Sequence, residues 1–189
     1  MLHTIGDSHS RFGWDYVPNA KIHHLGPKLA FSIGRDGIDV SGYVTSGDTL
    51  VFSFGEIDCR CHVHKHATPA NPYNEIINDI VIKYITAIHA AVSDNNIRVC
   101  VFNIPPPIQR HNTVETPEYP YLGTDEERKM YVLHFNAELR KVCASYNYLF
   151  IDVYDKYTDS NGFLDKALSD GIVHIKNGTY IKEFVEKYL

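Results

Sequence analysis

The sequence has no long run of apolar residues, carries no excess of basic charge, and contains little cysteine. Without about 18 consecutive apolar residues, a membrane-spanning helix is not expected. The 18 lysines and arginines are outnumbered by 23 aspartates and glutamates, which gives a formal net charge of −5. Nucleic-acid binding favours concentrated positive charge instead. We therefore expect neither a membrane nor a nucleic acid as a partner.

The first residues also lack the basic segment followed by an apolar segment that is typical of a secretory signal. A cytoplasmic location is therefore the expectation. In that compartment the four cysteines of the chain are expected to be reduced thiols rather than a disulfide framework. Cys100 and Cys143 lie among apolar residues and are predicted to be small core side chains.

A chain of 189 residues with 44% hydrophobic and 22% charged residues is predicted to form one domain over residues 1–189. Apolar runs of strand length alternate with segments of helical periodicity. Strands are expected at residues 2–6, 21–25, 49–54, 97–103 and 148–153, and helices at 28–34, 73–92, 125–146 and 179–189. Thr124 and Glu127 form a possible capping box for the third helix. This alternation predicts a three-layer α/β/α sandwich with a mainly parallel five-stranded sheet.

Ser8 lies where the first predicted strand should turn, directly after Gly6 and Asp7. Parallel sheets keep their sites at the carboxyl ends of strands, so a serine there is well placed as a nucleophile if a base lies nearby. His174 is a candidate base and Asp170 a candidate group to orient it, which would give acyl transfer through an acyl-serine. Each has a simpler interpretation: Ser8 as a helix cap, and Asp170 as a turn residue beside Gly171.

Four short blocks occur in the order found in the SGNH/GDSL hydrolases: Gly6-Asp7-Ser8, Gly26, Gly55-Glu56-Ile57-Asp58 and residues 170–174. The chain resembles this family from residue 6 to residue 174. The resemblance implies a flavodoxin-like sandwich with Ser8 as nucleophile, His174 as base and Asp170 as its partner. It also implies an oxyanion hole that includes the backbone N–H groups of Ser8 and Gly26. Candidates for substrate contacts are Asp7, Gly55, Glu56, Asp58, Arg110 and His111.

Two departures from the family pattern affect the expected site. The third block usually reads Gly-x-Asn-Asp, and Ile57 replaces the asparagine, so one oxyanion donor is absent. Such a loss costs roughly a hundred- to a thousandfold in rate elsewhere. Arg60 and Asn103 are the candidate substitutes. Three residues rather than two separate Asp170 from His174, so a bulge or turn is expected around Gly171.

Histidines and cysteines are concentrated in residues 59–66, Cys-Arg-Cys-His-Val-His-Lys-His. In an extended segment His62, His64 and His66 would share one face, and with Cys59 and Cys61 they would offer ligands for zinc or copper. The spacing matches no strong zinc pattern, and a histidine-rich rim of the active site is the alternative. We expect no metal and no other cofactor.

The loop over residues 105–123 is longer than most connections, which is typical of a binding loop or lid. Its Gln109, Arg110, His111, Tyr119 and Tyr121 are suited to sugar or other polar contacts, although a solvated surface loop explains them as well. We therefore expect a serine esterase for a small acyl ester of a hydrophilic substrate, such as an O-acetylated carbohydrate. The alternatives are an O-acyltransferase with the same serine, and an inactive glycan-binding module. The oligomeric state is left open.

Overall fold

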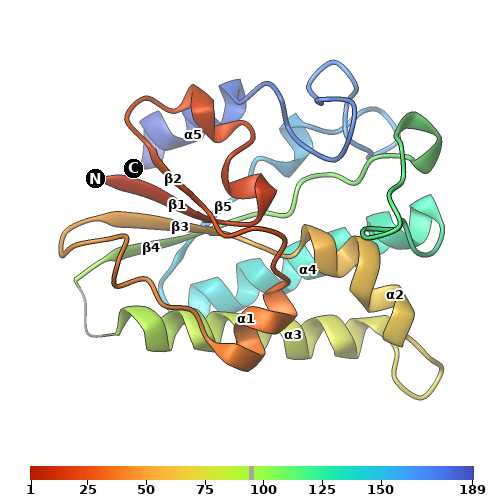
Figure 1. Cartoon of the computed structure of the whole chain (residues 1–189), viewed down its shortest axis with the longest axis horizontal. Coiled ribbons are helices and arrows are strands. Elements are labelled where there is room, and N and C mark those ends of the chain that lie inside the picture. The colour runs from red at the N-terminus through yellow and green to blue at the C-terminus, as the bar shows by residue number, and fades with distance from the viewer. Residues whose placement is uncertain (94–95) are drawn as a thin grey trace.

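The computed structural model describes residues 1–93 and 96–189, and its centre is a five-stranded parallel sheet (Figure 1). The strands are β1 (Leu2–Gly6), β2 (Lys21–His24), β3 (Thr49–Ser53), β4 (Arg98–Phe102) and β5 (Leu149–Ile151). Their order across the sheet is β2-β1-β3-β4-β5, and every neighbouring pair is parallel. The predicted α/β fold with a parallel sheet is confirmed.

Strands β1 and β3 lie inside the sheet, and their apolar side chains are buried on both faces. Ile5 pairs in register with Phe52, and Gly6 pairs with Ser53. Ile5, Val51 and Phe52 have no exposed surface. Continuous burial of this kind is what near-unbroken apolar runs indicate in parallel strands. Because all five strands run the same way, the segments that follow them meet at one edge of the sheet.

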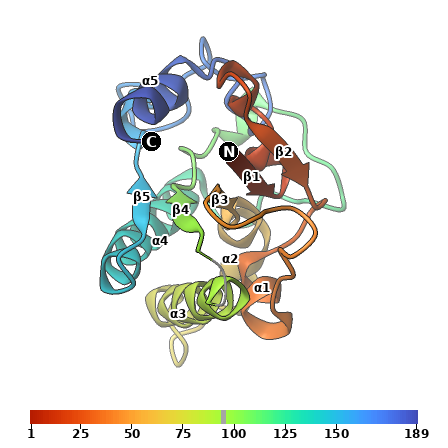
Figure 2. The same cartoon turned by 90° about the vertical axis from the view of Figure 1, so that its left-hand side faces the viewer.

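Helices cover both faces of the sheet, unequally (Figure 2). One face carries the helices α1 (Ala30–Asp36), α2 (Val63–His66), α3 (Tyr73–Val92) and α4 (Asp125–Ser145). The other carries α5 (Thr179–Tyr188) together with short turns and loops. Two separate clusters of buried apolar side chains fill the spaces between these layers. The three-layer expectation is confirmed, with a single longer helix on the second face.

The two long helices have the ends and faces that their sequences predict. The buried stripe of α3 follows helical spacing and comprises Ile77, Ile80, Val81, Tyr84, Ile85, Ile88 and Val92. Helix α4 begins after Thr124, whose Oγ1 accepts from the N–H of Glu127 at 3.2 Å. The Glu127 carboxylate accepts from the N–H of Thr124 at 2.7 Å, so the capping box is complete. Within residues 1–93 and 96–189, no helix combines the length and the apolar character that a bilayer crossing requires.

Candidate active site

Ser8 lies at the carboxyl end of β1 because of two local features of the chain. Gly6 packs so closely on β3 that a Cβ atom there would be 2.1 Å from the carbonyl oxygen of Ser53. Only glycine allows this approach. Ser8 then opens a short 3₁₀ turn, which Asp7 caps by accepting from the N–H of His9 at 2.8 Å. The turn leaves the Ser8 side chain half-buried at the edge of the sheet.

The structure brings Ser8, His174 and Asp170 together in one hydrogen-bonded row. His174 Nε2 lies 2.9 Å from Ser8 Oγ, and His174 Nδ1 lies 2.7 Å from Asp170 Oδ2. A base within hydrogen-bond reach of a hydroxyl, and oriented by a carboxylate on its other nitrogen, is the arrangement that activates a serine. The geometry therefore fits the roles predicted for the three residues.

A tight loop accommodates the extra residue between Asp170 and His174. The N–H of Asp170 donates to the carbonyl of His174 at 3.1 Å, which closes the loop. Gly171 has φ +86°, a left-handed conformation that favours glycine. Asp170 Oδ1 accepts from the N–H of Ile172 at 2.8 Å and of His174 at 3.2 Å. The expected turn around Gly171 thus exists, and it leaves Asp170 Oδ2 for the imidazole.

The surroundings of His174 keep its ring neutral and fixed. Burial lowers the pKa of His174 below 6.5, and His9 acts in the same direction, although Asp170 opposes both. Burial alone would raise the pKa of Asp170, but the hydrogen bond from His174 and those from backbone N–H groups lower it. Phe12 stacks on the His174 ring with centroids 4.1 Å apart. A neutral, oriented imidazole is the form that accepts a proton from serine.

The lowered pKa of His174 predicts how kcat/KM depends on pH on the acid side of neutrality. The imidazole must be neutral to act as a base, so kcat/KM for an uncharged ester should rise with pH and reach half its plateau below pH 6.5. The profile is measured by steady-state kinetics, with circular dichroism at each pH as the control for unfolding. A midpoint above about pH 7 in folded protein would contradict this assignment.

Two backbone N–H groups are available beside Ser8 for an oxyanion. Within the described ranges, the N–H groups of Ser8 and Gly26 donate to no backbone or side-chain acceptor. Gly26 follows Leu25, whose N–H donates to the carbonyl of Gly6 at 2.8 Å, so both N–H groups belong to the same edge of the sheet. Ile57 lines the pocket next to Ser8. Its side chain offers no donor, so the departure from the family pattern is present in the site itself.

The candidate substitute Asn103 does not serve as the missing donor, and that prediction is wrong. Its side-chain amide donates to the carbonyl of Ile104 at 2.8 Å, and its oxygen accepts from the N–H of Val153 at 2.9 Å. The residue is 1% exposed and does not line the pocket beside Ser8. Its amide instead joins the end of β4 to the segment that follows β5.

Arg60, the other candidate substitute, lines the pocket but is held by other partners. Its Nε and Nη2 donate to the two carboxylate oxygens of Glu56 at 2.7 and 3.0 Å. Its Nη1 donates to the carbonyl of Tyr119 at 2.8 Å. The guanidinium also lies 5.2 Å from the centre of the Tyr121 ring. Glu56 therefore neutralises Arg60 and is not a substrate contact, and the oxyanion role of Arg60 remains a prediction.

Three further candidates for substrate contact lie inside the protein, so these predictions are wrong. Asp58 is fully buried and accepts from the N–H groups of Ala30 at 2.7 Å and Phe31 at 3.0 Å, which caps α1. This cap starts the helix at Ala30 rather than at residue 28. Burial raises the pKa of Asp58 to about 7, although the two N–H groups oppose the shift. Asp7 and Gly55 are also buried.

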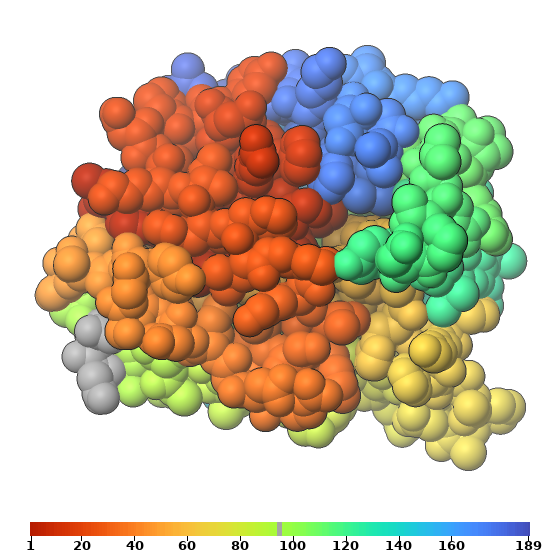
Figure 3. All heavy atoms as spheres, viewed as in Figure 1, coloured from red at the N-terminus to blue at the C-terminus, as the bar shows by residue number. Residues whose placement is uncertain are grey.

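A cavity of about 350 Å³ opens beside Ser8 and His174. Its lining comes from the carboxyl ends of all five strands and the segments that follow them: Ser8, His24, Pro27, Ile57, Arg60, Val114, Thr116, Tyr119, Tyr121, Ile172, Val173 and His174. The loop after β4, green in Figure 3, meets the red and blue segments from the two ends of the chain on this face. We call residues 113–121 of that loop the wall loop.

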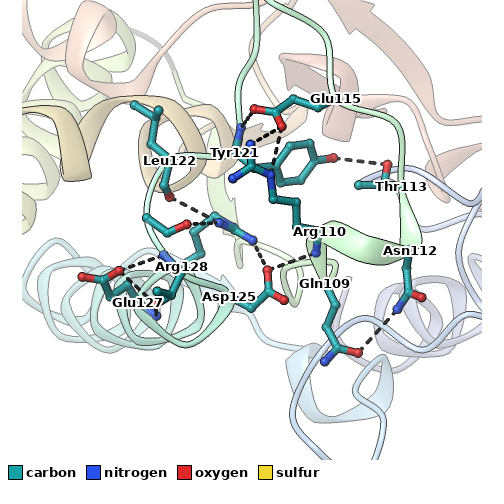
Figure 4. Close-up of polar contacts among 12 residues, drawn as sticks. Gln109, Arg110, Asn112, Thr113, Glu115, Tyr121, Leu122, Asp125, Glu127 and Arg128 are labelled. Carbon is teal, nitrogen blue, oxygen red and sulfur yellow. Dashed lines mark hydrogen bonds and ion pairs between the residues drawn. The ribbon is translucent and has the colours of Figure 1, made fainter.

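The wall loop contributes Val114, Thr116, Tyr119 and Tyr121 to the cavity, whereas its Glu115 binds Arg110, which precedes the loop (Figure 4). Glu115 accepts from Arg110 Nε at 2.9 Å and from the N–H of Tyr121 at 3.0 Å. Neither Arg110 nor His111 lines the cavity, so the substrate contacts predicted for them are not supported. The buried Arg128 donates to the carbonyl of Gly123 at 2.8 Å and fixes the end of the loop.

The alternative of a metal site in residues 59–66 loses its geometric basis. The segment is helical rather than extended, a π-helical turn (Asp58–His62) followed by α2. His62 and His66 therefore lie one helical turn apart, with ring centroids 4.5 Å apart and the rings tilted by 52°, whereas His64 Nδ1 lies 3.2 Å from the hydroxyl of Tyr131. Across the described parts of the chain, no three histidine, cysteine or acidic side chains are grouped to hold a metal ion.

Sequence reasoning missed several residues around the hydrogen-bonded row of Ser8, His174 and Asp170. His9 directly follows Ser8, and its ring centroid lies 5.0 Å from that of His174. Phe12 stacks on His174, and Val114 and Ile172 line the cavity. The position of His9, directly after the first block, was a signal that could have been used. The other three have no sequence signal, because their places depend on how the loops fold.

Comparison with known proteins gives a match in structure but not in sequence. No protein-family model and no curated protein matches the chain. Among solved structures, a lipolytic protein of the G-D-S-L family from Veillonella parvula is 12% identical, with a TM-score of 0.63, over 100% of this chain and 97% of that one. Phospholipase A1 from Streptomyces albidoflavus is 10% identical, with a TM-score of 0.60, over 100% and 98%.

An acetylxylan esterase from Geobacillus stearothermophilus, solved as a catalytic mutant, is 9% identical, with a TM-score of 0.60, over 98% of this chain and 92% of that one. At these identities the matches establish a shared architecture. The matches span nearly the whole of each chain. The chain therefore has the fold of the SGNH/GDSL hydrolases, the family that its sequence resembles.

Proposed function

We propose that this protein is a serine esterase that works through an acyl-Ser8 intermediate. The observation that carries the proposal is the hydrogen-bonded row from Ser8 Oγ through His174 to Asp170, at the edge of a cavity. A glycan-binding module would have no need of a base 2.9 Å from a serine hydroxyl. The fold shared with lipolytic enzymes and an acetylxylan esterase supports the same class of reaction.

The reaction proceeds in two balanced halves. Ser8 Oγ attacks the ester carbonyl while His174 Nε2 takes its proton, and the N–H groups of Ser8 and Gly26 hold the developing oxyanion. The carbon–oxygen bond to the alcohol then breaks, and the alcohol leaves with the proton from His174. Water next attacks the acyl-serine with His174 again as base. The carboxylic acid is released and the Ser8 hydroxyl is restored.

The test is covalent labelling with a fluorophosphonate probe, which reacts with activated serines. Wild-type protein should be labelled, and Ser8→Ala and His174→Ala should abolish labelling without loss of the circular dichroism spectrum. Ser10→Ala is the matched control, because Ser10 is buried in the same turn and donates to the carbonyl of Asp7 at 2.8 Å. Labelling that persists in Ser8→Ala, or folded wild type that is never labelled, would contradict the proposal.

Transfer of the acyl group to a sugar hydroxyl would use the same intermediate, so labelling does not separate hydrolysis from transfer. Product analysis with and without a carbohydrate acceptor does. The expectation of an O-acetylated carbohydrate rested on polar and aromatic residues of the loop, namely Gln109, Arg110, His111, Tyr119 and Tyr121. The rings of Tyr119 and Tyr121 line the cavity. Arg110 is paired with Glu115, and neither Arg110 nor His111 lines the cavity. We therefore propose hydrolysis of an ester, and infer the class of ester from the residues that line the cavity.

A further inference from the structure

The cavity beside Ser8 has mostly apolar walls, although the surrounding loops are rich in polar residues. Ile57, Val173 and Tyr121 lie inside it with 6%, 8% and 3% of their surface exposed. Val114 and Ile172 stand at its rim and are 83% and 48% exposed. Exposed apolar residues that continue a buried apolar surface mark a place where a ligand is bound.

The charged guanidinium in the cavity lining is neutralised by a carboxylate of the protein itself. Arg60 is the only lysine, arginine or acidic residue of its lining in the described ranges, and both oxygens of Glu56 accept from it. In the wall loop, Glu115 is likewise paired and accepts from Arg110, and neither of these residues lines the cavity (Figure 4). An anionic group in the substrate would compete with Glu56 for a guanidinium that already has its partners. The cavity therefore favours an uncharged ester.

The size of the cavity exceeds what an acetyl group needs. Its volume is about 350 Å³, and a water molecule takes about 30 Å³ of liquid volume. The space thus holds on the order of ten water-sized groups, which is room for an ester group and a chain of about four to eight carbons. The wall loop is fixed around this space, since Arg60 holds Tyr119 and Glu115 holds Tyr121.

We propose that the cavity binds an uncharged ester with an apolar chain of about four to eight carbons next to the ester bond, rather than an acetyl ester of a sugar. This inference rests on the proposed esterase function and names its substrate class. The chain belongs either to the acid or to the alcohol of the ester. Both cases share the same recognition, in which methylene groups leave water for the apolar walls.

The experiment compares two series of esters at fixed conditions. Methyl esters of acids from acetate to octanoate lengthen the acyl side, and acetates of alcohols from methanol to octanol lengthen the alcohol side. In one series kcat/KM should rise about threefold to fourfold per buried methylene until the cavity is full. The series that rises identifies the side of the ester that enters the cavity. A profile that is flat or falling in both series would overturn the proposal.

A variant at the rim tests whether the cavity causes the rise. Val114→Asp places a charge on the apolar rim, at a position exposed enough for the fold to tolerate it. The ratio of kcat/KM between the best ester and methyl acetate should fall about tenfold. Ile82→Asp is the matched control, because Ile82 is 54% exposed on α3 and does not line the cavity. An unchanged ratio in Val114→Asp would contradict the proposal.

The labelling experiment separates failure of this inference from failure of the proposed function. Labelled protein that hydrolyses acetylated sugars, or methyl acetate as fast as any longer ester of either series, is an esterase with another substrate class, and the inference is then wrong. Protein that is folded but neither labelled nor active on any ester would overturn the esterase function, and this inference with it.

Discussion

Asp170→Asn should lower kcat/KM about 10³- to 10⁴-fold while the protein stays folded. The asparagine oxygen can still accept from the backbone N–H groups that Asp170 Oδ1 now binds, those of Ile172 and His174. Its amide then faces His174 Nδ1, where Asp170 Oδ2 accepts at 2.7 Å. An N–H donor at that point forces the imidazole proton onto Nε2, which faces Ser8. His174 can then no longer take the Ser8 proton.

The measurement is steady-state hydrolysis of an activated ester, together with the rate of fluorophosphonate labelling, which should fall in parallel. Thermal unfolding controls for loss of structure. Asp15→Asn is the matched variant, because Asp15 is an exposed carboxylate that does not line the cavity, and its loss should leave both rates unchanged. A fall of less than about tenfold would show that Asp170 is only a turn residue, the simpler interpretation that the sequence also allowed.

The fold was predictable because its signals are local. Continuous apolar runs indicate β3 and β4, the apolar stripe indicates α3, and the Thr124–Glu127 pair marks the start of α4. Strand ends and the start of α1 were less accurate. Helix α1 begins where Asp58, from a distant segment, caps it. A cap supplied from across the fold leaves no mark in the residues next to the helix.

The meeting of Ser8, His174 and Asp170 was predictable from the order of blocks, whereas the contacts of the surrounding residues were not. Asp58 and Asn103 are polar residues at the carboxyl edge of the sheet, where substrate contacts are expected. Their side chains point inward and satisfy backbone groups instead. Arg110 resembled a binding residue until the loop placed it against Glu115. Sequence gives the edge to which a side chain belongs, but tertiary contacts decide which way it points.

Glu56→Gln should lower the free energy of unfolding by about 3–5 kcal/mol, because it leaves the Arg60 charge buried without its partner. The two side chains are each 11% exposed and make two hydrogen bonds. Burial alone would raise the pKa of Glu56, but the charge and hydrogen bonds of Arg60, together with His9, whose Nε2 lies 3.7 Å away, lower it, so the carboxylate is charged at neutral pH. In a chain of 189 residues the loss corresponds to a melting temperature roughly 6–20 °C lower.

An exposed pair of the same spacing gives the matched control. Asp79 and Lys83 also lie four residues apart, with a distance of 2.7 Å, but their side chains are 56% and 57% exposed. Asp79→Asn should therefore cost only about 0.3–0.5 kcal/mol. The measurement is thermal and urea unfolding of both variants. Equal, small losses in the two would show that the Glu56–Arg60 pair is screened by water like a surface pair.

The double variant Glu56→Gln with Arg60→Met distinguishes two roles of Arg60: its buried charge, which affects stability, and its hydrogen bond to Tyr119, which holds the wall loop. Removing both charges should recover most of the stability lost in Glu56→Gln, since an apolar side chain of similar volume replaces a buried ion pair at little cost. The double variant should nevertheless be less active than wild type on the longer esters, because a methionine side chain cannot donate to the carbonyl of Tyr119, which Arg60 now holds at 2.8 Å. Relative to wild type, the double variant should show a larger increase in KM for the longer esters than decrease in kcat. Recovery of both stability and KM would instead show that the wall loop keeps its place without Arg60.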